Sequence, residues 1–204
     1  MKKILILILF LGFSAPTFSQ EFGYDDIASR TDHFGIKLGL NFSNLNANPD
    51  DPNYKTATKF PYLALLSTMK LSDMFLFQGE AGYNLLGANY DLYTNADPIK
   101  LSLGYITLGA LMKAYFLQDI KLNVLLGIQY GYLIFAQQED LDRLDNYKTS
   151  DFDLLAGIGY DFDFGLIIEM RYLLGLTNVT NLQDIHYSSS IKNSAIQLQF
   201  GWLF

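Results

Sequence analysis

The chain has 204 residues, of which 50% are hydrophobic, 15% are aromatic and only 17% are charged. It contains no cysteine and only two histidines, which excludes a disulfide scaffold, a cysteine-ligated metal and a multi-histidine metal centre. The net charge of −7 argues against a nucleic-acid partner, because phosphate binding requires a basic face. The many tyrosines and phenylalanines favour strands over helices.

The N-terminal segment has the features of a secretory signal peptide. Lys2 and Lys3 precede an apolar run over residues 4–13, and Thr17 and Ser19 have the spacing of a cleavage site. The run is too short for a membrane helix, which needs roughly 20 residues. We therefore predict a signal peptide over residues 1–19, an N-terminal periplasmic segment over residues 20–32 and a barrel domain over residues 33–204.

The first strand signal covers residues 34–42. Bulky apolar residues occupy alternate positions from Phe34 to Phe42, and glycine, lysine and asparagine occupy the positions between them. A period of two over nine residues predicts a β-strand that is long enough to cross a bilayer. The same alternation, clear or weaker, predicts seven further strands, over residues 59–70, 75–86, 101–116, 121–135, 151–162, 166–176 and 194–204.

The predicted connectors alternate between short and long. Residues 71–73, 117–119 and 163–165 are tight turns, whereas residues 43–58, 89–100, 136–150 and 177–193 are long polar loops. This pattern predicts an all-β fold, an eight-stranded antiparallel up-and-down barrel. In an outer membrane, four long loops would be extracellular and three short turns periplasmic.

Two kinds of barrel fit this outline. A lipocalin-like soluble barrel has its apolar face inside, and a transmembrane barrel has it outside. One strand face here is rich in glycine, glutamine and isolated charges, which suits a narrow lumen filled with side chains. The other face is bulky and apolar, with aromatic residues near strand ends at Phe34, Phe42, Phe75, Tyr160, Phe162, Trp202 and Phe204. We therefore predict a monomeric transmembrane barrel in the outer membrane of a Gram-negative bacterium.

Charged and amide side chains on the predicted lumen face lie towards the short-turn end. They are Lys37, Gln78, Glu80, Lys113, Glu169, Arg171, Gln197 and Gln199. Three cations and two carboxylates at one level predict a paired network that closes the lumen, because unpaired charges would be costly there. A path for protons or ions through these residues is the alternative.

The remaining candidate residues lie outside the strand interiors. Asp184, His186 and the serines at 188–190 have the composition of a hydrolase, but they lie along one loop, whereas catalytic partners normally converge from different segments. His33 is expected at an interface, at the start of the first strand.

Two acidic loops could bind calcium. Residues 139–145 carry four carboxylates, and Asp50 and Asp51 lie in another loop, but the spacing lacks the glycine and the terminal glutamate of an EF-hand. We expect a solvated acidic surface there. The sequence therefore predicts no catalytic residues, no metal site and no cofactor.

Four segments resemble the PorT-like outer-membrane β-barrel proteins, also described as an outer membrane protein beta-barrel domain. They are FGIKLGLNFSNL at 34–45, FQGEAGY at 77–83, EMRYLLGLTNV at 169–179 and QLQFGWLF at 197–204. The similarity covers essentially the whole chain after the signal peptide. The resemblance implies the barrel fold and an outer-membrane location, and PorT itself takes part in protein secretion of the type IX kind.

The predicted function is that of a small structural or interaction component of the cell envelope, which the resemblance links to secretion of the type IX kind. The alternatives are a narrow pore or transporter for small solutes, and an outer-membrane enzyme with an active site at the loop end. The expected partners are outer-membrane lipid, other envelope or secretion proteins, and the outer-membrane assembly machinery. Two C-terminal aromatic residues, Trp202 and Phe204, are the predicted signal for that machinery.

Overall fold

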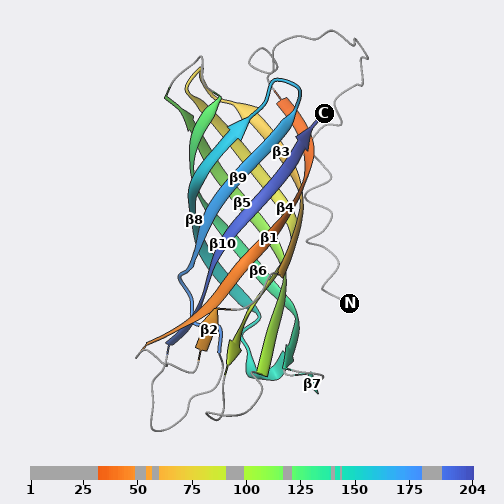
Figure 1. The fold of residues 1–204 in the computed structure, drawn as a ribbon, viewed down its shortest axis with the longest axis vertical. Coiled ribbons are helices and arrows are strands. Elements are labelled where there is room, and N and C mark those ends of the chain that lie inside the picture. The colour runs from red at the N-terminus through yellow and green to blue at the C-terminus, as the bar shows by residue number, and fades with distance from the viewer. Residues whose placement is uncertain are drawn as a thin grey trace, which may run out of the picture.

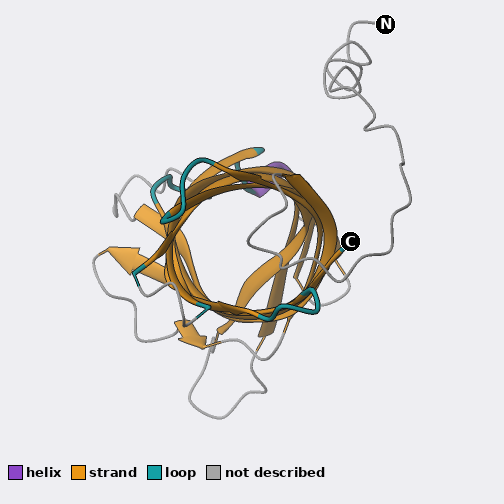
Figure 2. Cartoon of the chain, turned by 90° about the horizontal axis from the view of Figure 1, so that it is seen from above, coloured by secondary structure: helices purple, strands orange, loops and turns teal. Residues whose placement is uncertain are grey.

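The computed structural model describes residues 32–48, 54–56, 60–90, 99–116, 121–138, 141–142, 144–180 and 190–204. Eight long strands form one closed antiparallel sheet (Figure 1; Figure 2). They are β1 (Asp32–Asn48), β3 (Phe60–Lys70), β4 (Phe75–Tyr90), β5 (Ile99–Tyr115), β6 (Leu122–Gln138), β8 (Ser150–Asp161), β9 (Leu166–Gly175) and β10 (Ser190–Leu203).

Three short elements accompany these strands at the long-loop end. Strand β2 (Tyr54–Thr56) pairs with β4, and strand β7 (Leu141–Asp142) pairs with β6. A single 3-10 turn, η2 (Leu144–Asn146), follows β7. No helix among the described residues is long and apolar enough to cross a membrane.

Each long strand pairs with the next long strand along the chain, and the last strand returns to the first. The closing ladder between β1 and β10 places Leu38 opposite Phe200, and the Phe204 amide donates to the Phe34 carbonyl at 2.8 Å. This ring confirms the predicted eight-stranded up-and-down barrel. Because the ring is closed, its long strands expose no unpaired backbone edge to the lipid.

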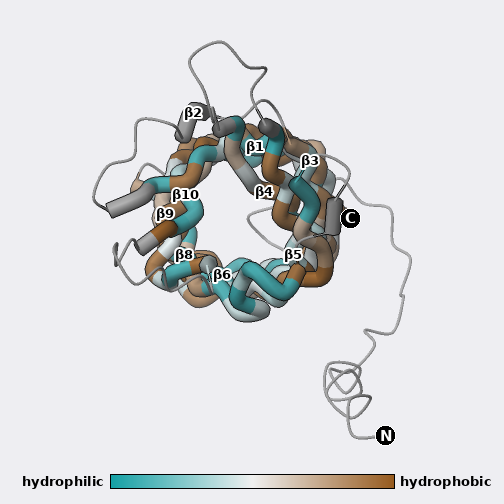
Figure 3. Tube along the Cα trace, turned by 90° about the horizontal axis from the view of Figure 1, so that it is seen from below, coloured by the Kyte–Doolittle hydropathy of each residue, from teal (hydrophilic) through white to brown (hydrophobic). Residues whose placement is uncertain are grey.

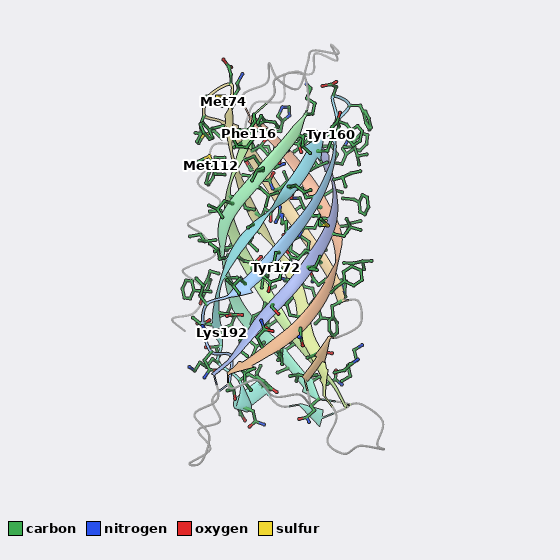
Figure 4. The ribbon with its side chains drawn as sticks, turned by 60° about the vertical axis from the view of Figure 1, so that its left-hand side comes forward. Met74, Met112, Phe116, Tyr160, Tyr172 and Lys192 are labelled. Atoms are coloured by element: carbon green, nitrogen blue, oxygen red, sulfur yellow. The ribbon has the colours of Figure 1, made fainter. Side chains whose placement is uncertain are left out.

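Alternation gives each strand a lumen face and an outer face. In β1, Lys37 and Asn41 are fully buried, whereas Phe34 and Leu38 are more than half exposed. Figure 3 shows hydrophilic and hydrophobic positions alternating around the wall. In Figure 4, apolar side chains project outwards along the barrel, among them Met112, Phe116 and Tyr172. An apolar outer face around a lumen that holds buried charged side chains is the arrangement of a transmembrane barrel, not of a lipocalin-like one.

Tight turns connect strands at one end of the barrel. Residues 71–74 join β3 to β4, and residues 162–165 join β8 to β9, while the third predicted turn, residues 117–119, lies outside the described residues. Gly165 has a φ of 101°, in the left-handed region that favours glycine. Beside this turn, the rings of Phe162, Phe164 and Trp202 follow one another with centroids 5.2 and 5.8 Å apart, as expected for an aromatic girdle.

The strands extend further towards the long-loop end than the sequence analysis predicts. Residues 43–48 continue β1 and pair with residues 190–195 of β10, although the sequence predicts residues 43–48 and 190–193 within loops. Likewise, β4 reaches Tyr90, β5 begins at Ile99 and β6 reaches Gln138. The predicted loop boundaries are therefore wrong. Bulky apolar alternation is required only where the wall faces lipid, whereas the backbone ladder continues as long as a partner strand lies alongside.

The predicted signal peptide and nearly all of the predicted periplasmic segment lie outside the described residues.

Candidate functional site

Six charged side chains from five strands meet inside the barrel, towards the short-turn end. We call them the ion network: Lys37 of β1, Glu80 of β4, Lys113 of β5, Asp161 of β8, and Glu169 and Arg171 of β9. None of the six is more than 8% exposed. Three cations balance three carboxylates, so the network is formally neutral.

Arg171 crosses the lumen. Its Nη1 donates to Glu80 Oε2 at 2.8 Å, and its Nη2 donates to Glu80 Oε1 at 2.5 Å, which is a bidentate pair. In the ring of eight long strands, β9 and β4 are four steps apart in either direction, so this pair lies across the barrel diameter. Arg171 Nε also donates to Glu169 Oε2 at 2.8 Å, on its own strand.

The two lysines connect the remaining carboxylates. Lys37 Nζ lies 2.6 Å from Glu80 Oε1 and 2.8 Å from Glu169 Oε2. Lys113 Nζ lies 2.8 Å from Glu169 Oε1 and 3.1 Å from both carboxylate oxygens of Asp161. Each cation therefore contacts two carboxylates, and the network is continuous from β4 to β8.

Neutral side chains complete the hydrogen bonding of two carboxylates. The Tyr62 hydroxyl donates to Glu80 Oε2 at 2.8 Å, and Gln78 Nε2 donates to Glu80 Oε1 at 2.7 Å. The Tyr115 hydroxyl donates to Asp161 Oδ2 at 2.5 Å. Such additional bonds offset part of the desolvation cost of buried charge.

A chain of amides also connects side chains along one side of the lumen. Gln199 Nε2 donates to Gln197 Oε1 at 3.2 Å, and Gln197 Nε2 donates to Asn41 Oδ1 at 2.9 Å. Asn41 Nδ2 in turn donates to Asn84 Oδ1 at 2.7 Å. This chain links β10, β1 and β4.

Glycine lies opposite four members of the ion network on a neighbouring strand. The pairs are Lys37 with Gly201, Glu80 with Gly109, Glu169 with Gly159 and Arg171 with Gly157. A Cβ at position 157 would lie 2.2 Å from the Met170 carbonyl oxygen and 2.8 Å from the Arg171 Cα. A side chain at position 157 would therefore collide with the β9 backbone next to Arg171, whereas a Cβ at position 109 would make only ordinary contacts, the nearest at 3.6 Å.

Buried apolar side chains fill the lumen beyond the ion network, towards the long-loop end. We call this group the apolar layer; its largest members are Leu45, Leu86, Leu101, Leu103, Tyr105, Leu111, Leu125, Leu133, Leu155 and Leu173. Leu144 of η2 and Tyr147, which follows it, pack against this group. The described side chains therefore include both the ion network and, next to it, the apolar layer, and both occupy the lumen.

The structure brings all eight predicted lumen residues to the lumen face, buried. The predicted balance of three cations to two carboxylates is wrong, however, because Asp161 adds a third carboxylate. Its position follows from the alternation that points Phe152 outwards, so the sequence contained the signal. Tyr62 and Tyr115 were also missed, since tyrosine suits either face of a strand.

The other predicted positions are placed differently or not at all. His33 is 5% exposed, with Nδ1 3.3 Å from the Phe204 carbonyl oxygen, so it is buried rather than at an interface. Asp184, His186, the serines at 188 and 189, and Asp50 and Asp51 lie outside the described residues. Residues 139, 140 and 143 of the acidic loop at 139–145 also lie outside them. Where the chain is described, no three histidine, aspartate or glutamate residues form a group able to hold a metal.

Residues 18–181 match the family model described as outer membrane protein beta-barrel domain. The chain belongs to this family. As a member of the outer membrane protein beta-barrel domain family with an apolar outer wall, the protein is located in the outer membrane of a Gram-negative bacterium. No curated protein matches the chain significantly.

Solved outer-membrane barrels share the fold. Neisserial surface protein A is 11% identical, with a TM-score of 0.53 over 84% of this chain and 97% of its own. The outer membrane protein OprG from Pseudomonas aeruginosa is also 11% identical, with a TM-score of 0.50 over 88% of this chain and 99% of its own. At these identities the likeness concerns the fold alone.

Proposed function

We propose that this barrel is a non-conducting structural or interaction component of the outer membrane, whose long loops contact other envelope components. The observation that carries the proposal is the ion network, which crosses the lumen as a neutral, buried set of ion pairs. The apolar layer lies beyond it. Small solutes or ions would have to break both, and an eight-stranded barrel is only wide enough for its own side chains.

The proposal includes no catalytic step. The three carboxylates of the ion network are each bound by a cation, which holds them as structural anions rather than as free acids or bases. A nucleophile with an adjacent base and a group that orients the base would be needed for acyl transfer. The described lumen residues support packing and charge pairing instead.

We further propose that the protein is PorT-like and is linked to secretion of the type IX kind. The support is the sequence resemblance, and the segments that carry it also carry the lumen residues. Lys37 lies in the first segment, Glu80 in the second and Arg171 in the third. The resemblance therefore includes the interior of the barrel as well as its lipid-facing wall.

Affinity capture from native outer membranes tests the interaction role. The intact protein, tagged and solubilised in mild detergent, should co-purify with specific envelope proteins. The matched control is a variant in which residues 91–98 and 181–189 are each replaced by a short glycine-serine turn, and it should lose them while still folding. If the two baits capture the same proteins, or if neither captures any, the interaction role is contradicted.

The link to secretion needs a separate measurement. In a strain that lacks this protein, cargo of type IX secretion should accumulate in the periplasm, and the intact gene should restore export. Normal export in the deletion strain would contradict the link and leave the interaction role standing.

A further inference from the structure

Two further carboxyl groups lie in the lumen nearer the long-loop end. Asp151 and Asp153 of β8 are 1% and 2% exposed. Because they are two residues apart on one strand, they share the lumen face, and we call them the acidic pair. Among the described residues, no lysine, arginine or histidine forms an ion pair with either of them. The acidic pair therefore lacks the counter-charge that balances the ion network.

The side chains of Asp151 and Asp153 are hydrogen-bonded to each other. A carboxylate ion has acceptors only, so two carboxyl groups share a hydrogen bond only when one of them carries a proton. Two adjacent buried negative charges would also repel each other, and a single proton removes that repulsion. The contact is therefore that of a neutral carboxylic acid with a carboxylate.

The neighbouring donors identify the ionised member of the acidic pair. Asp151 Oδ1 accepts from the Thr177 hydroxyl at 2.5 Å, and Asp151 Oδ2 accepts from Asn193 Nδ2 at 2.6 Å. The Thr177 oxygen itself accepts from the Phe152 amide at 3.0 Å, which leaves its proton for Asp151. Both oxygens of Asp151 thus act as acceptors, as those of a carboxylate do.

Asp153 differs from Asp151 in having one oxygen without a donor. Its Oδ2 accepts from Gln129 Nε2 at 3.0 Å, whereas its Oδ1 is buried and accepts no hydrogen bond from a described group. An Oδ1 that carries the proton needs no donor, because it can donate to Asp151 instead. A proton on Asp153 accounts both for this oxygen and for the contact between the two side chains.

Asp151 connects three parts of the wall near the long-loop end. Thr177 lies just after β9, and Asn193 lies in the first part of β10. Asn193 Nδ2 also donates to the Tyr105 hydroxyl of β5 at 3.1 Å. Through these bonds, Asp151 holds the end of β9 and the start of β10 to β8, so the charge of the acidic pair affects how these strands are held together.

The groups around the acidic pair are neutral at neutral pH. On the strands alongside, the acidic pair is opposite Gly131 and Gln129 of β6 and Gly175 of β9. The titratable groups that face this place from other described elements are two tyrosines, Tyr105 of β5 and Tyr147 after η2. A tyrosine has an ordinary pKa of about 10. At lower pH, the group that titrates here is the acidic pair itself.

We propose that Asp153 retains a proton at neutral pH, and that this proton makes the acidic pair a pH-sensitive latch that holds Thr177 and Asn193 to β8. Loss of the proton at alkaline pH leaves two adjacent buried charges, so the latch opens. In the unfolded chain, an aspartate is ionised at neutral pH. The folded barrel therefore holds one proton more than the unfolded chain, and its stability falls as the pH rises until the folded pair has also lost that proton.

Amide hydrogen exchange of the purified full-length barrel in detergent micelles, at about pH 7 and about pH 9, tests the latch below the ordinary pKa of tyrosine. In the wild type, the protection factor of the Phe152 amide, which donates to Thr177, should fall by up to about tenfold per pH unit, the limit for one proton. Asp153→Asn supplies an amide that donates to Asp151 without a titratable proton, so this variant should fold and keep its protection at both pH values. Asp163→Asn, in the exposed turn at the opposite end, should follow the wild type.

Infrared spectroscopy locates the proton. At neutral pH, the wild type should show the carbonyl band of a protonated carboxylic acid, and Asp153→Asn should lack it. Asp151→Asn should lower the unfolding midpoint, because its amide nitrogen would face the donor of Thr177 or of Asn193. Each of three results would overturn the latch: a wild type without the band, a band that persists in Asp153→Asn, or a loss of Phe152 protection with pH in Asp153→Asn equal to that of the wild type.

Discussion

Arg171 shows how single residues close this barrel. Its guanidinium binds Glu80 across the lumen and Glu169 on its own strand, and all three are buried. A buried ion pair contributes little net stability compared with an apolar pair, but removal of one partner leaves an uncompensated charge. Loss of Arg171 is therefore expected to destabilise the barrel chiefly because it removes a counter-charge from the buried carboxylates of Glu80 and Glu169.

Arg171→Ala should destabilise the folded barrel by about 3–5 kcal/mol, because Glu80 and Glu169 would lose a shared counter-charge in the lumen. The matched control is Lys121→Ala, which removes an ion pair with Asp163 at the exposed rim and should cost only about 0–1 kcal/mol. Urea unfolding in lipid vesicles measures both. Equal unfolding midpoints for the two variants would show that the ion network is not energetically coupled.

The glycines beside the ion network allow a second test. Gly157→Val should destabilise the barrel by about 1–3 kcal/mol through overpacking, because even its Cβ would meet the Met170 carbonyl oxygen at 2.2 Å. Gly79→Val is the control, since a Cβ there would meet no atom nearer than 3.9 Å. If the two variants unfold at the same denaturant concentration, glycine at position 157 is not needed for the close approach of β8 to the β9 backbone beside Arg171.

The lumen face could be assigned from sequence residue by residue, but the contacts within it could not. Alternation alone places Lys37 and Arg171 inside, because one strand position in two must face the lumen. That Arg171 bonds to Glu80 depends on β9 and β4 being opposite each other, which requires the order of the closed ring. The leucines of the apolar layer were harder still to assign to the lumen, because leucine is equally suited to a lipid-facing wall and to a packed lumen.

Strand β1 shows how a whole element is specified. Its outer face is apolar from Phe34 to Phe42 and polar at Asn44 and Asn46, although the β-ladder continues to Asn48. The lipid-facing part was therefore predictable from period-two apolar alternation. The extension beyond it was not, because polar residues outside the lipid carry no comparable pattern and the ladder there depends on β10.

Leu38→Arg should destabilise the barrel strongly, because Leu38 is 58% exposed on the outer face and lies in the lipid-facing part of β1. A midplane arginine costs about 2–4 kcal/mol, and one near the interface costs about 0–1 kcal/mol. Asn46→Arg, on the same face of the same strand near the long-loop end, is the control for position. Folding of both variants into vesicles with equal stability would contradict the assigned position of the membrane along β1.

At the scale of the whole molecule, the barrel depends on closure between its first and last strands. Fourteen register pairs join β1 to β10, and these strands are far apart in sequence. The C-terminal strand must therefore be delivered to β1 before the wall is complete. Its outer face ends in Trp202 and Phe204, both exposed.

Deletion of Phe204 should reduce the amount of barrel inserted in cells and leave refolding into detergent micelles largely intact. The reason is the proposed role of the terminal aromatic residues as a signal for the assembly machinery. Phe116→Ala is the control, because Phe116 is an equally exposed aromatic residue near the short-turn end but is not terminal. Normal insertion in cells with reduced stability in detergent would show that Phe204 acts through packing alone.

The central claim is that this barrel does not conduct, because its ion network and apolar layer fill the lumen. Ion current through planar bilayers that contain the folded wild-type protein tests it most directly, with a known porin as the positive control. We predict no discrete unitary current from the wild type under conditions in which the porin conducts. Stable single-channel steps that scale with the amount of folded wild-type barrel would contradict the claim.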